Sequence, residues 1–218
     1  MIKIIRSFQP AKPVLPILFF LSLFNIQAEP AAVNAKASRE NYPPNGIWQA
    51  SIIRKDGHTI RFNFEIKDSA GNKIMYVMNG RARLLADDIR LHKDSVYIEM
   101  PFFDSRFALT WSGDGKLEGS WIKNYGHRQV IMPFLAIHNE SKRFSVSRSP
   151  AFDITGRWAV QFKNKNQSVE NAIGEFSQSG SYITGTFLTT TGDYRFLEGV
   201  VDGDSLKLSK FDGGHAYY

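Results

Sequence analysis

Short runs of alternating apolar and polar residues are the feature that most limits what this chain can fold into. They include residues 59–66 (TIRFNFEI), 96–100 (VYIEM) and 182–187 (YITGTF). A period of two, rich in β-branched and aromatic residues, is the pattern of β-strands. The runs are separated by pairs typical of hairpin turns. These are Asp56-Gly57, Ala70-Gly71-Asn72, Asp114-Gly115, Ser179-Gly180 and Asp202-Gly203. No segment after residue 28 sustains an amphipathic helix pattern for three turns, so the sequence predicts an all-β fold of antiparallel meanders, a barrel or a sandwich.

Landmarks of the chain recur at one spacing, which indicates an internal repeat. Gly46-Ile47-Trp48 returns as Gly156-Arg157-Trp158, and Asp94-Ser95 returns as Asp204-Ser205, both 110 residues later. Residues 74–80 (IMYVMNG) parallel residues 183–187 (ITGTF), and Phe103-Asp104 parallels Phe211-Asp212. We therefore predict two related β-units, at residues 45–140 and 153–218, joined by a linker at residues 141–152.

The second unit is shorter than the first. After Phe103-Asp104 the first unit continues through about three more strand patterns, which end in residues 128–137 (RQVIMPFLAI). The second unit has only Ala216-Tyr217-Tyr218 at the corresponding place. A half-closed barrel leaves strand-edge groups unpaired, which natural β-proteins avoid. We therefore expect the second unit to be truncated and the protein to continue beyond Tyr218.

The N-terminal residues have the pattern of a targeting segment. Lys3, Arg6 and Lys12 precede an uncharged apolar run at residues 14–24 (VLPILFFLSLF), and Ile26-Gln27-Ala28 offers a small residue for cleavage. This order is typical of a secretory signal peptide. It predicts a signal peptide at residues 1–28, a linker at 29–44 and a periplasmic or otherwise exported protein; an uncleaved N-terminal anchor is the alternative. No cysteine follows the run, so it is not a lipoprotein signal.

Charge and cysteine content exclude several classes of function. The formal net charge is +6, and it falls to +3 once the three basic residues of the leader are removed. Such a mild excess without Lys/Arg clusters gives no reason to expect nucleic-acid binding. The chain has no cysteine, which excludes a dithiol redox centre, a thiol nucleophile and a Cys-zinc site within these residues.

The second unit resembles a known family. The resemblance lies in Gly174-Glu175-Phe176 and in three longer stretches, which are residues 183–199 (ITGTFLTTTGDYRFLEG), 203–209 (GDSLKLS) and 211–216 (FDGGHA). These stretches are similar to the β-rich N-terminal domain that precedes the thioredoxin-like domain of exported TlpA-type thiol–disulfide oxidoreductases. The resemblance is close over about residues 153–218 and general over residues 45–140. It implies a partner in cis, a C-terminal thioredoxin-like redoxin domain with a Cys-x-x-Cys motif, which would hold all the redox residues of the disulfide reductase.

Other candidate chemistry is weak, and we predict no catalytic, cofactor-binding or metal-binding residue and no cofactor. Gly-His pairs at residues 57–58, 126–127 and 214–215, with His92 and His138, lack zinc or copper spacing and lie at predicted turns. Asp87-Asp88, Asp202 and Asp204 lack the glutamate of a calcium loop and are interpreted as solvated turns. No Gly-x-Ser-x-Gly elbow occurs, and Gly113-Asp114-Gly115 precedes no helix, so it is a turn rather than a phosphate loop.

The aromatic residues leave two interpretations open. They are Phe62, Phe64, Phe102, Phe103, Phe107, Trp111, Trp121 and Phe134. Small barrels either fill their interiors with such side chains or hold one small ligand. Trp48 and Trp158 stand in a Gly-x-Trp triplet similar to the opening of lipocalins. The hypotheses are thus a non-catalytic domain of a periplasmic oxidoreductase, a lipocalin-like module for a small apolar ligand, and a structural domain that offers sheet edges to a partner.

Overall fold

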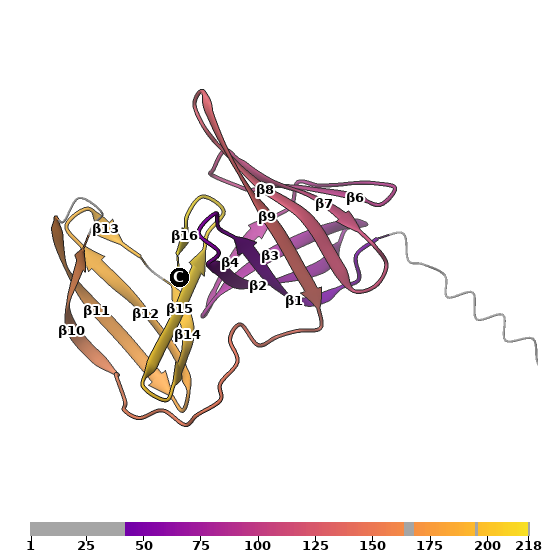
Figure 1. The fold of residues 1–218 in the computed structure, drawn as a ribbon. Coiled ribbons are helices and arrows are strands. Elements are labelled where there is room, and N and C mark those ends of the chain that lie inside the picture. Colours follow the sequence, from indigo (N-terminus) through magenta and orange to yellow (C-terminus); the bar gives the residue numbers. More distant parts are fainter. Residues whose placement is uncertain (1–41, 164–167, 195, 218) are drawn as a thin grey trace, which may run out of the picture. The chain divides into compact units, whose positions relative to one another are not determined.

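A computed structural model describes residues 42–163, 168–194 and 196–217. All regular structure in these residues is β, in two antiparallel sheets (Figure 1). This confirms the predicted all-β class. The predicted signal peptide and most of the predicted linker that follows it lie outside the described residues. Within the described residues, no helix has the length and hydropathy needed to cross a membrane.

The first sheet is a meander of nine strands that forms a nearly closed barrel. Its order is β4-β3-β2-β1-β9-β8-β7-β6-β5, so the barrel closes where β1 pairs with β9 and stays unpaired between β4 and β5. The strands are β1 (Gly46–Ile53), β2 (Thr59–Ser69), β3 (Asn72–Asn79), β4 (Ala82–Ala86), β5 (Ile89–His92), β6 (Ser95–Glu99), β7 (Ser105–Trp111), β8 (Lys116–Tyr125) and β9 (Arg128–His138).

Aromatic rings fill the interior of this barrel. Trp48 is fully buried, stacks on Phe64 with ring centroids 5.9 Å apart and meets Trp111 edge-on at 5.8 Å. Phe107 packs against Phe134 at 4.8 Å. Alternation along each strand sends these side chains inward, as a sheet with one buried face requires. The packing favours core side chains over the ligand-cavity interpretation for these aromatic residues, except that Phe102 is 90% exposed and lies outside the core.

The second sheet repeats the pairing of the first. Its order is β10-β11-β12-β14-β15-β16, and β13 pairs with β12. Gly156 pairs with Phe176 as Gly46 pairs with Ile66, and Ser179 pairs with Tyr182 as Ser69 pairs with Asn72; all four positions shift by 110. This confirms two related meander units. The strands are β10 (Gly156–Lys163), β11 (Val169–Ser179), β12 (Tyr182–Thr189), β13 (Gly192–Asp193), β14 (Leu197–Asp202), β15 (Ser205–Phe211) and β16 (Ala216–Tyr217).

The two units differ in how far their sheets close. Within the described residues, no strand pairs with the outer edge of β10, which lies at one side of the second sheet (Figure 1). The indoles of Trp48 and Trp158 each donate to the carbonyl four residues earlier, yet Trp48 is 0% exposed and Trp158 is 48% exposed. The core of this sheet centres on Phe176, Ile183 and Val201. Its apolar face therefore remains partly open to solvent.

The end of β15 enters the core of the first barrel. Phe211 is 0% exposed, stacks on Phe62 with ring centroids 4.3 Å apart and meets Trp121 edge-on at 5.6 Å. The Asn79 side chain donates to the Phe211 carbonyl at 2.6 Å and accepts from its N–H at 3.3 Å. The sequence predicted a turn at Gly214-His215, and the structure places this pair in the β15–β16 turn, which follows Phe211. It did not predict that the residue before this turn completes the other unit's core.

The glycines of this turn allow its close approach to the barrel. The Ser105 hydroxyl donates to the Gly213 carbonyl, and the Lys123 ammonium donates to the Gly214 carbonyl. A Cβ on Gly214 would collide with the ring of Phe103. Inward-facing polar residues at the barrel end thus bind the backbone of the second unit's β15–β16 turn.

Candidate functional site

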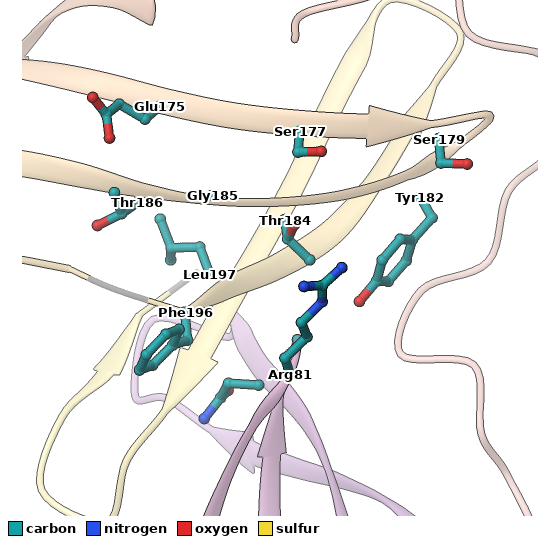
Figure 2. Close-up of a pocket in the computed structure, with 12 residues that line it drawn as sticks. Arg81, Glu175, Ser177, Ser179, Tyr182, Thr184, Gly185, Thr186, Phe196 and Leu197 are labelled. Atoms are coloured by element: carbon teal, nitrogen blue, oxygen red, sulfur yellow. The ribbon is translucent and has the colours of Figure 1, made fainter. Parts of the chain in front are cut away.

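A cavity of about 660 Å³ lies between the β3–β4 turn and strands β11 and β12. Its size is within the range of small-molecule sites, roughly 300–1,000 Å³. Figure 2 shows the lining side chains, with Arg81, Tyr182 and Thr184 at one end and Glu175 and Thr186 toward the other. The full lining is Asn79, Gly80, Arg81, Glu175, Ser177, Ser179, Tyr182, Thr184, Gly185, Thr186, Phe196 and Leu197.

Strand alternation places the hydroxyl groups of this cavity on one face. Three polar pairs lie directly opposite each other on β11 and β12. They are Glu175 with Thr186, Ser177 with Thr184, and Ser179 with Tyr182. Because side chains two residues apart on a strand share a face, these pairs form a ladder of six polar side chains. The opposite face of the same strands carries the apolar Phe176, Ile183 and Phe187.

The β3–β4 turn forms the facing wall. The Gly80 N–H donates to the Glu198 carboxylate at 2.6 Å, and Gly80 adopts a left-handed φ of 55°. A Cβ on Gly80 would approach the Thr184 methyl to 3.3 Å, so glycine lets the turn lie close to β12. The next residue, Arg81, is exposed and reaches the cavity (Figure 2).

A buried arginine from the linker holds this wall in place. Arg143 is 4% exposed, and its guanidinium donates to the Met78 carbonyl at 2.6 Å and pairs with Glu198 at 3.2 Å. It also donates to the Ser209 carbonyl at 3.2 Å and to the Asn63 side chain at 3.3 Å. Burial lowers the pKa of Arg143, and the Glu198 carboxylate opposes that shift. One cation therefore satisfies acceptors from β2, β3, β14 and β15.

Tyr182 contributes a neutral phenol hydroxyl group at the edge of the cavity. Partial desolvation, and next the nearby Glu198 carboxylate, raise the pKa of Tyr182 above its ordinary value. The ordinary value is already about 10, so the phenol stays protonated at neutral pH. It offers both a donor and an acceptor to a ligand.

Two further features mark the far end of the cavity. The Thr186 hydroxyl is buried and makes no hydrogen bond to any described residue. An unsatisfied buried hydroxyl costs about 1–3 kcal/mol. Phe196 is 48% exposed and has φ of 60°, a left-handed conformation that is rare for bulky residues and is enriched at functional sites. Both features suit a site that is completed by a ligand or water.

The cavity offers hydroxyl groups, one arginine and one carboxylate that is already paired. Its carboxylate, Glu175, pairs with Arg157 at 2.9 Å. Within the described part of the chain, no group of three His, Cys, Asp or Glu side chains is placed to hold a metal ion. His58, His127 and His215 lie in the β1–β2, β8–β9 and β15–β16 turns.

The structure corrects the interpretation of one acidic residue. Asp202 was predicted in a solvated turn, but it is 6% exposed. Its carboxylate pairs with Lys207 at 2.7 Å and accepts from the backbone N–H groups of Ser147 and Arg148 at 2.9 and 2.8 Å. These bonds hold the pKa of Asp202 well below its usual range. The prediction was wrong because the alternation pattern does not show that the linker returns to this turn.

Sequence reasoning did not predict the cavity. The signal was present in residues 175–186, where Ser177, Ser179, Thr184 and Thr186 alternate with residues of the opposite face. Hydroxyl side chains are common on the solvent-facing side of a sheet. The sequence pattern therefore did not reveal the second wall, which turns this surface into a cavity. That wall depends on the contact of Gly80 with Glu198, which joins residues 118 positions apart.

Comparison with protein-family models, with curated proteins and with solved structures found no match for this chain.

Proposed function

We propose that this chain is a non-catalytic β-module whose second sheet accepts one more strand along β10. We further propose that it is the N-terminal module of an exported thiol–disulfide oxidoreductase and that the accepted strand belongs to the part of that protein that carries the redox domain. The observation behind the proposal is the open edge of β10, in a unit whose register repeats that of a closed one.

The first unit supplies the template for this strand. There β9 covers β1, with Trp48 opposite His138, Ala50 opposite Ala136 and Ile52 opposite Phe134. The equivalent inward positions of β10 are Trp158, Val160 and Phe162, each 110 residues later. An added antiparallel strand with small and aromatic residues at alternate positions would cover them, as in β-augmentation.

The charges on β10 favour a different chain segment over a second copy of β10. Arg157 and Lys163 point to the polar face, and both are exposed. Antiparallel pairing of two β10 strands about Val160 would place Arg157 opposite Lys163, and like charges directly opposite are destabilising. A strand with acidic residues between its apolar positions would instead place a carboxylate opposite Lys163, while Arg157 already pairs with Glu175 at 2.9 Å.

The redox assignment rests on the resemblance of residues 174–216. The chain has no cysteine, so any thiol–disulfide exchange belongs to a thioredoxin-like domain that follows it. The coding sequence downstream of codon 218 tests this part directly. A Cys-x-x-Cys motif after a βαβ pattern within about 150 codons, one ordinary domain length, supports it. An immediate stop codon would contradict the oxidoreductase proposal. The proposal that β10 accepts a strand is tested separately.

A peptide experiment tests the edge. The probe has phenylalanine and alanine at alternate positions with glutamate between them, and binding is followed by the fluorescence of Trp158. Two N-methylated versions block either one or the other edge of the peptide backbone. We expect only one of the two to bind, because a β-strand uses a single edge for each neighbour. Equal binding of both versions would show that the peptide binds by nonspecific apolar contact and not by strand pairing, and would contradict the proposal.

Matched variants locate the peptide. Val160→Asp places a charge on the inward face of β10 and should abolish binding. Thr190→Asp adds the same charge in the exposed β12–β13 turn and should leave binding unchanged. Equal loss in both variants, or a concentration-dependent dimer that excludes the peptide, contradicts the proposal.

A further inference from the structure

We propose that the cavity between β11, β12 and the β3–β4 turn binds an acidic saccharide, with Arg81 receiving its carboxylate. This site lies on the face of the second sheet opposite its open apolar face, and the inference does not depend on the proposed redox function or on strand acceptance at β10.

The ladder of polar side chains matches a ligand that carries many hydroxyl groups. Ser177, Ser179, Tyr182 and Thr184 each offer a hydroxyl that can donate and accept. Directly opposite residues lie about 5 Å apart on adjacent strands, and successive pairs follow at about 7 Å. A ring bearing hydroxyls around its rim can meet several of these groups at once. The unpartnered Thr186 hydroxyl adds one more at the far end.

The charge balance of the cavity selects an acidic ligand. Arg81 and Glu175 are the charged residues of the lining. Glu175 is neutralised by Arg157 at 2.9 Å, whereas among the described residues no carboxylate forms an ion pair with Arg81. A guanidinium presents a planar fork that matches a carboxylate in bidentate geometry.

Phe196 and Leu197 add an apolar surface to the same cavity. The Phe196 ring is 48% exposed and its backbone is left-handed, which presents the ring beside the polar ladder. A pyranose has apolar C–H faces and a polar rim, so it can use the ring and the hydroxyls together. Inorganic phosphate would use Arg81 alone, and a purely apolar ligand would leave the ladder unsatisfied.

Calorimetry with two disaccharides tests the inference. Digalacturonate carries carboxylates, and digalactose is its neutral counterpart. We expect digalacturonate to bind about tenfold more tightly, the effect of one charge-assisted hydrogen-bonded pair. Inorganic phosphate at the same concentration should not displace it. Equal affinity for the two sugars, displacement by phosphate, or no binding of digalacturonate overturns the proposal.

Variants of the cavity lining and a control variant outside it separate binding from folding. Arg81→Ala should reduce digalacturonate affinity to that of digalactose, and Arg81→Lys should give an intermediate value because the charge remains without the fork. Arg128→Ala removes another exposed arginine, in β9, and should change neither affinity. Thr184→Val should weaken both sugars. Wild-type affinity of Arg81→Ala for digalacturonate would refute the assignment.

Discussion

Replacing Phe211 with alanine tests whether the second unit completes the core of the first. The ring is 0% exposed and contacts Phe62 at 4.3 Å, Phe107 at 5.6 Å and Trp121 at 5.6 Å between centroids. Truncation of a buried phenylalanine to alanine costs about 3–5 kcal/mol, because apolar contact is lost and a cavity remains. This range for truncation of a whole ring already includes the loss of its aromatic contacts. We therefore expect a loss of about 4 kcal/mol.

Urea unfolding followed by tryptophan fluorescence measures this loss, because Trp121 lies beside the substituted ring. Leu206 is the matched control, since it occupies the same strand but is 44% exposed. Leu206→Ala should cost less than about 1 kcal/mol, as surface substitutions do. A Phe211→Ala variant that loses no more than the Leu206→Ala control would refute the shared core.

Three further changes probe the contacts that surround this core. Arg143→Met leaves Glu198 without its cation and should cost about 3–5 kcal/mol in urea unfolding; adding Glu198→Gln should restore part of the loss, and no restoration would contradict the ion pair. The Lys207 ammonium is the main cause of the lowered pKa of Asp202. The ionised carboxylate of Asp202 therefore stabilises the folded state at pH values above the unfolded pKa of about 3.9. This stabilisation is lost as the pH falls toward the pKa of Asp202 in the folded state. In the Asp202→Asn variant, the thermal midpoint should therefore decrease less between about pH 4 and pH 2 than in the wild type. An equal decrease in both proteins would contradict the stabilising role of this carboxylate. A Cβ on Gly199 would collide with the Lys207 carbonyl, so Gly199→Ala should cost about 1–3 kcal/mol; wild-type thermal stability would show that β14 and β15 are less closely paired.

Local patterns predicted the strands and turns because they depend on neighbours in sequence. The alternation in residues 59–66 and 182–187 marks β2 and β12, and the five turn signals fall at hairpin connections. The 110-residue spacing of Gly46-Ile47-Trp48 predicted pairs that the second sheet reproduces in register. These features follow from backbone preferences and side-chain alternation, which a single sequence contains.

Contacts between the units could not be predicted from the same patterns. Alternation shows that the Phe211 side chain faces a core, but it does not show which of the two units this core belongs to. Trp48 and Trp158 share a triplet and an indole bond, yet their burial differs because β9 covers only the first. The cavity depends in the same way on Arg143 and Glu198, which lie 55 positions apart and meet only after both sheets form.

The contacts of Phe211 imply that the duplicated units are no longer interchangeable. In the first unit the β6–β7 turn carries Phe103, and in the second the β15–β16 turn carries His215; the two rings meet edge-on at 5.2 Å. Corresponding turns of the two copies therefore bind each other. Asn79 pairs with both backbone groups of Phe211, so without the second copy a buried amide and a core ring position would be left unfilled. The first unit thus encloses a core, and the second unit supplies Phe211 to that core, while no described strand pairs with the outer edge of its own β10.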